Sequence, residues 1–511
     1  MKVRQVTVCH TCRARKLGCD GKRPACTQCV MTRRKCAGYN YDLIFVPMSK
    51  TGSRVRHGDV SKKSPNNKGD ARAEARRRAA LKAEAHQQSP ARQDHHASAL
   101  YPISPSLHWP LQHIILLLIQ NFAPTLHPDV TDLDAAFSPP RICGSWVELL
   151  PDIADTPEHE VTIAAPVRTL AMSILARGYH GIAPMGDALT THCTALRSVN
   201  RALVHANQES TNVLTAAVMC LMISELILPQ SDASTSQTHV LGLQALLKLQ
   251  GPAFYVSGQA HRLFIGLRPA MIVQAICTRN PTFLAEPTWK TVPFKLIKPA
   301  PLHQLMTIAA DLPGLLREFD HSMVGNPHGK SVGPQPRKVL SSHLELLHVL
   351  ENWHNNYYEQ LEQPSYWHAD RKDHGPCLWF LDITVANCLT HYWALWIICV
   401  TNIRLLRATY PDLGALAMLI GGDVPESTTV TKCLREIAIS ILESVNYLMQ
   451  DDMKLYGATS LILPLQTAFQ HLRSHHPTEK SLIEACDNSI DSIEGKGFHY
   501  IGHFLRATCT G

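Results

Sequence analysis

The sequence predicts a small cysteine-rich module, built of two short helix-loop halves, followed by a large all-α domain. Six of the sixteen cysteines fall between positions 9 and 36, in a regular spacing. From Leu107 onward, apolar residues recur at helical intervals, and the long uncharged runs lack the alternation of strands. With 511 residues, of which 45% are hydrophobic and 18% charged, the chain can bury a sizeable core. Wholesale disorder is therefore excluded.

Charge is distributed as unevenly as cysteine. Residues 1–98 contain 22 Lys or Arg against 7 Asp or Glu, a surplus of 15 positive charges. The remaining residues contain 27 against 35, a deficit of 8. A basic arm on an acidic body is typical of a protein whose one end binds a polyanion. The alternative is a basic tail that is merely solvated.

The start of the chain, Met1 to Gln5, has no apolar signal-peptide core, so we expect an intracellular protein with reduced cysteines. The longest apolar run that we identify, Leu111–Ile119, is about half of the roughly 18 residues that a spanning helix needs. We therefore expect no membrane partner. The ten cysteines after position 36 contain no Cys-x-x-Cys pair and are interpreted as small buried hydrophobes.

The six clustered cysteines repeat one half-motif, C-x2-C-x6-C, twice. They are Cys9, Cys12, Cys19, Cys26, Cys29 and Cys36. Structural zinc takes four ligands, so two ions need eight ligand positions, and two of the six thiolates must bridge. The pseudo-symmetric choice is the first cysteine of each half, so that one ion contacts Cys9, Cys12, Cys19 and Cys26, and the other Cys26, Cys29, Cys36 and Cys9.

Three alternatives to this metal site are disfavoured. A disulfide framework does not suit a chain without a signal peptide. A mononuclear zinc ribbon or RING-like module would leave Cys19 and Cys36 unused, and His10 is too close to Cys9 to bind the same ion. An iron–sulfur cluster suits the Lys- and Arg-filled intervals less well than phosphate binding does.

Residues 5–45 resemble the fungal-type binuclear zinc cluster, the six-cysteine DNA-binding module of fungal transcription factors. The cysteine spacing, the basic first half, the loop Asp20–Pro24 and the pair Gly38-Tyr39 carry the resemblance. It implies two Zn²⁺ ions per chain, bridging by the first and fourth cysteines, and double-stranded DNA as the partner. Pro24 matches the proline that turns the chain between the halves.

The resemblance also implies roles for the basic residues. Lys16 matches the lysine that reads a CGG triplet in the major groove, and Arg13 and Arg15 match positions that contact phosphate or support the helix. Relatives often carry a further cation where this chain has Gly18. A lysine can donate to guanine O6 and N7, while neighbouring cations neutralise phosphates. The other candidate DNA contacts are Lys22, Arg23, Arg33, Arg34 and Lys35, of which the last three cannot all face DNA.

A basic linker is expected over residues 46–106, since almost no large apolar residue lies between Ser49 and Ser98. The stretch Asp70–His86 is rich in helix formers, but Leu81 is its one large apolar residue, which does not satisfy the heptads of a coiled coil. A nuclear import signal is the interpretation of Arg76, Arg77, Arg78 and Lys82; a soluble basic tail is the alternative.

The all-α domain is expected over residues 107–511, as a regulatory or effector domain. Residues 192–251 resemble the helical regulatory region of many filamentous-fungal regulators, which implies an α-helical superhelix or bundle. We find no nucleophile elbow, metalloprotease, P-loop or dinucleotide-binding motif, so no enzyme is expected. The expected helices are Leu111–Asn121, Pro166–Arg177, Asp187–Ala206, Thr211–Leu228, Thr238–Gln250, Leu302–Phe319, Leu340–Glu362, Leu378–Ala408, Ser427–Met449 and Leu461–Arg473.

These observations predict a nuclear, sequence-specific DNA-binding regulator of RNA polymerase II transcription. Its further partners would be the nuclear import and transcription machinery. Relatives of this length commonly control nutrient use or secondary-metabolite gene clusters. A ligand- or protein-binding corepressor whose basic arm only tethers it to DNA is the alternative. A monomer on a single triplet and a homodimer through the helical body are both compatible with the sequence.

Overall fold

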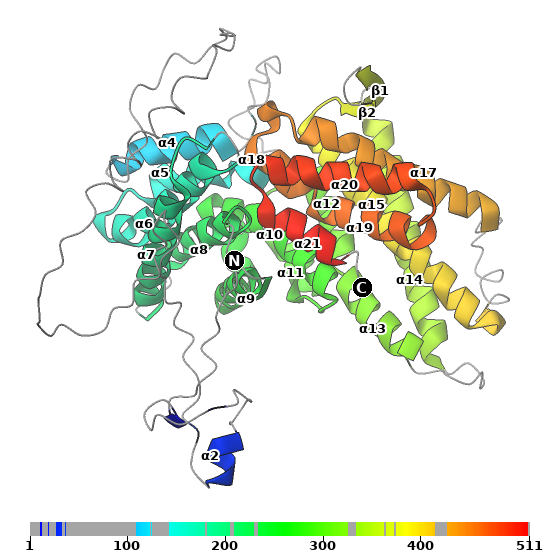
Figure 1. Cartoon of the computed structure of the whole chain (residues 1–511), viewed down its shortest axis with the longest axis horizontal. Helices are drawn as coiled ribbons and strands as arrows, with labels where there is room; N and C mark the ends of the chain where they lie inside the picture. The colour runs from blue at the N-terminus through cyan, green and yellow to red at the C-terminus, as the bar shows by residue number, and fades with distance from the viewer. Residues whose placement is uncertain are drawn as a thin grey trace, which may run out of the picture. The chain divides into compact units, whose positions relative to one another are not determined.

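The computed structural model describes residues 11–12, 19, 27–32, 36, 109–122, 124, 143–178, 181–204, 209–228, 233–324, 334–361, 364–371, 375–413 and 427–508. The chain divides into two compact units, Met1–Ala97 and Ser98–Gly511. Within the first unit, the helix α2 spans Thr27–Met31 (Figure 1). The whole predicted linker, 46–106, lies outside the described residues.

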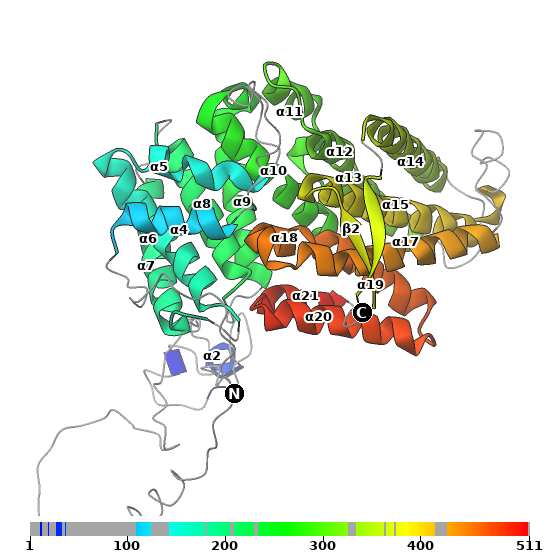
Figure 2. The same cartoon turned by 90° about the horizontal axis from the view of Figure 1, so that it is seen from above.

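The second unit begins with a group of helices that pack on α6 and α8 (Figures 1 and 2). α8 is buried along almost its entire length and therefore forms the centre of this group. α7 exposes one polar side, whereas α6 is exposed only near its start. The elements are α4 (Leu111–Phe122), η2 (Cys143–Leu149), α5 (Leu150–Ile153), α6 (Pro157–Ala176), α7 (Met185–Val204), α8 (Thr211–Glu225) and α9 (Ala233–Gln250).

The start of α6 corrects the predicted helix Pro166–Arg177, which began nine residues too late. Thr156 caps the helix, because its hydroxyl oxygen accepts from the backbone N–H of His159 at 3.3 Å, and Pro157 occupies the first turn. Pro166 lies inside the helix rather than at its start. A proline costs one backbone hydrogen bond, but the buried apolar residues on both sides keep this helix continuous.

A middle segment links the first helices to the later ones through α10, which contacts η2, α8, α12 and α13. α10 was not predicted, because Gly266 and Pro269 interrupt its pattern and buried residues occur all round it. The predicted helix Leu302–Phe319 is divided in two near Asp311. The elements are η3 (Pro252–Tyr255), α10 (Gly258–Thr278), η4 (Phe283–Ala285), α11 (Pro287–Thr291), η5 (Val292–Phe294), α12 (Pro301–Ala309) and α13 (Leu312–Val324).

A two-stranded hairpin interrupts the otherwise helical unit, so the all-α prediction holds for the described residues outside this hairpin. β1 (Tyr366–Arg371) pairs antiparallel with β2 (Gly375–Phe380), with Tyr366 opposite Phe380. The predicted helix Leu378–Ala408 therefore starts too early. Aromatic residues favour the strand, and Asp382 caps the helix that follows, since its Oδ1 accepts from Val385 N at 2.9 Å.

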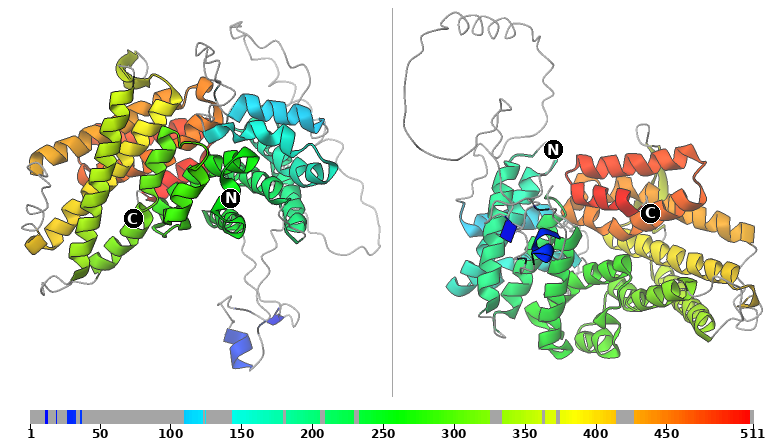
Figure 3. Two further views of the ribbon diagram at one scale, coloured as in Figure 1. Left: turned by 180° about the vertical axis from the view of Figure 1, so that it is seen from behind. Right: turned by 60° about the horizontal axis from the view of Figure 1, so that its bottom comes forward.

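The remaining helices form a layered bundle in which α15 and α19 are the most enclosed (Figure 3). They contact each other and α17, which also covers β2. Neither α20 nor α21 was predicted. The elements are α14 (Pro334–Gln360), α15 (Ile383–Thr409), η6 (Pro411–Leu413), α17 (Ser427–Leu448), η7 (Asp451–Met453), α18 (Lys454–Ser460), α19 (Ile462–His475), α20 (Lys480–Gly495) and α21 (His499–Thr508).

The apolar runs predicted no helix that could cross a membrane. This prediction was wrong, because α15 is long and apolar enough to do so by length and composition. No Asp, Glu, Lys or Arg occurs between Ile383 and Ile403. Of its most apolar window, 83% is buried inside the helical unit. It is therefore packed as the central helix of a bundle.

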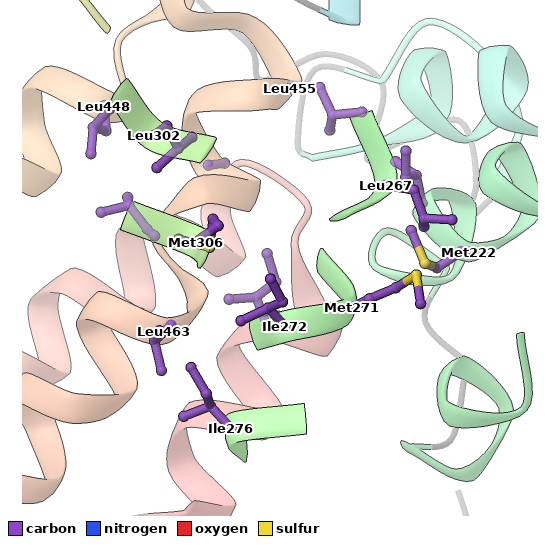
Figure 4. Close-up of a cluster of buried hydrophobic side chains, with 14 of the residues drawn as sticks. Met222, Leu267, Met271, Ile272, Ile276, Leu302, Met306, Leu448, Leu455 and Leu463 are labelled. Carbon is purple, nitrogen blue, oxygen red and sulfur yellow. The ribbon is translucent and has the colours of Figure 1, made fainter. Parts of the chain in front are cut away.

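One continuous apolar core joins the first helices to the later ones. Figure 4 shows side chains from α8, α10, α12 and α19 converging, among them Met222, Ile272, Leu302 and Leu463. Of the later cysteines whose burial is described, Cys220, Cys377, Cys388, Cys399 and Cys486 are buried, as predicted, whereas Cys277 and Cys433 are only half-buried. Cys193 is exposed, which corrects its predicted burial, because it lies on the solvent side of α7.

Two glycines bring distant parts of the second unit together. Gly178 follows α6 with φ 70°, and Gly497 follows α20 with φ 88°. A Cβ added to Gly497 would lie 2.3 Å from the backbone N of Gly178, so only glycine fits there. The end of α6 thus contacts the turn between α20 and α21.

Candidate metal centre and nucleic-acid interface

Four of the six predicted zinc ligands are described, and they form one cluster. Cys12 and Cys29 are 2% exposed, and their Sγ atoms lie 3.9 Å apart. Cys19 and Cys36 pack against this pair. The cluster therefore takes two cysteines from each half of the repeated motif.

The two halves present their cysteines in the same local setting. Cys12 and Cys29, the second cysteines of each half, lie in helical segments, and Cys29 belongs to α2. Cys19 and Cys36, seven residues further on, lie in irregular segments. The Thr32 hydroxyl donates to the Gln28 carbonyl oxygen at 2.7 Å, which closes the end of α2 ahead of the basic run 33–35. The repeated spacing thus produces a repeated local structure.

The donor set fits zinc in its chemistry. Two thiolates on one tetrahedral zinc lie about 3.8 Å apart, given zinc–sulfur bonds of about 2.3 Å. The Cys12–Cys29 separation matches that value, although the predicted ligand sets place these two residues on different ions. The bridging positions, Cys9 and Cys26, lie outside the described residues. Without them, no group of three or more His, Cys, Asp or Glu side chains in the described ranges is arranged to hold a metal.

Every predicted base- or phosphate-contacting side chain lies outside the described residues. These are Arg13, Arg15, Lys16, Lys22, Arg23, Arg33, Arg34 and Lys35, and the same holds for the predicted import residues Arg76, Arg77, Arg78 and Lys82. Their roles stay predictions.

Comparison with known families decides what the cysteine module is. Residues 7–42 match the fungal Zn(2)-Cys(6) binuclear cluster domain. Residues 7–42 therefore carry a domain that is typical of fungal zinc-cluster transcription factors. No curated protein and no solved structure matches it. The resemblance of residues 192–251 to a fungal regulatory region therefore stays a prediction, although helices do occupy the described part of that range.

This domain match confirms several predictions. A Zn(2)-Cys(6) domain binds two zinc ions, so this zinc-cluster protein uses zinc as its cofactor. The domain binds DNA and regulates transcription, and the family consists of DNA-binding regulators rather than enzymes. Such factors are nuclear in general.

The helical unit contains a buried polar cluster that the sequence analysis missed. Glu225, at the end of α8, is 1% exposed, and its Oε1 lies 2.9 Å from Nε2 of His239 and 3.8 Å from Nε2 of His192. Burial lowers the pKa of His192, and the Glu225 carboxylate partly offsets that effect. The three residues are spread over 48 positions of the sequence, so no local motif predicts that they meet.

The aromatic residues of α15 and the histidines at the end of α19 contribute to packing. Tyr392 and Trp393 are buried in α15, and Trp396 donates to Glu351 at 3.1 Å. The pair His475–His476 ends α19. His475 is exposed, whereas His476 is partly buried beside Glu479.

Proposed function

We propose that this zinc-cluster protein is a nuclear, sequence-specific regulator of RNA polymerase II transcription that reads CGG-type triplets. The observation that carries the proposal is the match of residues 7–42 to the binuclear cluster domain. The surplus of 15 positive charges over residues 1–98 supports it, because such an arm favours a polyanion. The proposed zinc ligands are Cys9, Cys12, Cys19, Cys26, Cys29 and Cys36, with Cys9 and Cys26 bridging.

In the proposed mechanism, zinc fixes the two halves and thereby presents the basic side chains to the duplex. Lys16 donates to guanine O6 or N7 and supplies sequence discrimination. Phosphate contacts supply most of the affinity and orient the module, and they make binding weaken with salt. Candidates for these contacts are Arg13, Arg15, Lys22, Arg23, Arg33, Arg34 and Lys35.

The organisation of the rest of the chain is part of the proposal. A cluster domain over 5–45 is followed by a linker over 46–106 and a regulatory unit over 107–511. In this proposal, an import receptor binds the basic residues Arg76, Arg77, Arg78 and Lys82. Replacing all four with alanine should therefore move a fluorescent fusion from the nucleus to the cytoplasm. The target genes are proposed to form a secondary-metabolite cluster, which transcript profiling after deletion of the gene would test.

The decisive experiment measures zinc content and selects bound sequences from a random duplex pool, using the full chain. Two zinc ions per chain and enriched CGG triplets are expected, and paired triplets would indicate a homodimer. No enriched sequence, with one zinc or none, would contradict the proposal.

A variant pair separates a DNA reader from a tethered corepressor. Lys16→Ala should keep both zinc ions but lose discrimination of the CGG triplet by at least about tenfold. Lys68→Ala removes the same charge from the predicted linker and should bind almost as the parent does. If Lys16→Ala discriminates like the parent, the arm only tethers the protein to DNA.

A further inference from the structure

The helical unit contains a partly open cavity of about 170 Å³ that no part of the proposed DNA-binding mechanism uses. Side chains of α8, α10, α12, α19 and α21 surround it, and most of them are apolar. Met222, Leu302 and Leu463 approach it from three different helices (Figure 4). The described residues that line the cavity include no Asp, Glu, Lys or Arg. A charged ligand would therefore lose its hydration without gaining a counter-ion.

The small residues of α10 account for the empty space. Gly266, Pro269, Ala270, Val273 and Cys277 recur at helical spacing and all line the cavity. The long side chains of the same helix, such as Leu267 and Met271, belong to the packed core instead. Because one face of α10 carries little volume, the helices opposite it cannot close the gap without losing their other contacts.

A buried histidine gives the cavity a hydrogen-bond acceptor. His391, on α15, is 5% exposed and lines the cavity, and its Nδ1 lies 2.8 Å from the carbonyl oxygen of Asn387. A carbonyl oxygen only accepts, so Nδ1 carries the proton and Nε2 has a free lone pair. Burial lowers the pKa of His391 to about 4, which keeps the ring neutral at pH 7.

Several other polar groups at the cavity already have partners. The hydroxyls of Thr459 and Ser460 donate to backbone carbonyl oxygens of α18, at 3.0 and 2.7 Å. Cys277 Sγ donates to Oε1 of Gln466 at 2.9 Å. The His391 ring therefore offers an acceptor beside several polar groups that are already engaged; the amide of Gln274, on α10, is a further polar group of the lining.

We propose that this cavity binds a small, uncharged, largely apolar molecule that donates one hydrogen bond to Nε2 of His391. An apolar cavity of about 150 Å³ accommodates benzene, so the ligand has the size of a substituted benzene ring, and a phenol is the simplest case. The ligand contacts α8, α10, α15 and α19 together. Its binding therefore stabilises the helical unit.

The test uses the full zinc-loaded chain with phenol and toluene, two probes of the same size that differ in the hydroxyl. Calorimetry should show binding of both, with phenol tighter by roughly tenfold, the value of one neutral hydrogen bond. His391→Leu should abolish that preference while toluene still binds. If neither probe binds the parent, or phenol and toluene bind it equally, the proposal is wrong.

A cavity-filling variant locates the site. Val273→Phe should abolish binding of both probes, and Val161→Phe, at a valine of α6 that is 75% exposed, should leave both affinities unchanged. If Val273→Phe does not fold, Ala270→Leu fills part of the same space and should weaken both probes at least fivefold. Parent-like binding by the folded cavity variant would overturn the proposal.

Discussion

Nε2 of His239 lies 2.9 Å from Oε1 of Glu225, and this contact attaches α9 to the end of α8. The carboxylate is 1% exposed and the imidazole 13% exposed, so water does little to screen the pair. An ionised group at this depth is costly unless it has partners. His239 is thus one of the residues that allow Glu225 to be buried.

Replacing His239 with leucine should therefore lower the free energy of unfolding by about 2 kcal/mol, the cost of removing a partner from a buried polar group. Urea unfolding followed by circular dichroism measures this. His321→Leu is the matched control, because His321 lies on the exposed side of α13, and a change within about 0.5 kcal/mol is expected. Equal effects would show that the Glu225 contact contributes little.

Phe380 anchors the β-hairpin to the neighbouring helices. Phe380 is 2% exposed, and its ring centroid lies 5.3 Å from that of Tyr447 and 6.3 Å from that of Trp393. Phe380→Ala should cost about 3 to 5 kcal/mol, since it leaves a cavity against α15 and α17. Trp367, on β1, is 43% exposed, and Trp367→Ala should cost less than about 1 kcal/mol. Thermal unfolding of the two variants measures how much stability each substitution removes.

His471 should make the helical unit sensitive to acid. Burial, followed by the neighbouring His475 and His476, lowers the pKa of His471 from 6.5 to about 4. Between these pH values the unfolded chain binds a proton that the folded protein does not, so stability is fully present above about pH 6.5. It is lost as the pH falls toward 4, by about 1.4 kcal/mol per pH unit. His391, also with a pKa of about 4, contributes with the same sign.

The variant His471→Phe tests this assignment. Neither ring nitrogen of His471 has a hydrogen-bond partner within the described residues, so an apolar ring should not lower stability at pH 7. Unfolding measured at pH 7 and pH 4.5 should show a smaller acid loss than in the parent. An unchanged loss would exclude His471 as a source of the acid sensitivity.

Removal of zinc should abolish the function of the first unit and leave the helices of the second unit folded. A chelator should abolish DNA binding, because small zinc modules unfold without their metal. The far-ultraviolet circular dichroism should change little, since most described helices lie in the second unit. Gel-shift and spectra of one treated sample, with zinc added back as the control, measure both. DNA binding that survives chelation would contradict a zinc-dependent reader.

The sequence was most informative where one residue type determines the structure. The cysteine spacing predicted a cluster that joins both halves, and Cys12 and Cys29 do meet. Amphipathic helices such as Leu111–Phe122 were placed within a residue of their observed bounds. α10 was missed because a helix buried on all sides has no polar face to set its period.

Tertiary contacts explain the other differences. The strand that contains Trp379 and Phe380 is stabilised by α17, which lies far along the sequence. The cavity beside His391 depends on which helices face the small residues of α10, and a sequence pattern does not specify that. The assignment of Lys16 to base reading came from family resemblance rather than from residue chemistry alone.

The contact between Gly178 and Gly497 affects how the protein is made. More than 300 residues separate the two glycines, so the helices around α6 emerge from the ribosome long before the turn that covers their end. Until that turn arrives, apolar surface of the early helices stays open to chaperones and to other nascent chains. Completion of the helical unit therefore waits for the turn after α20, which is synthesised long after the small zinc module.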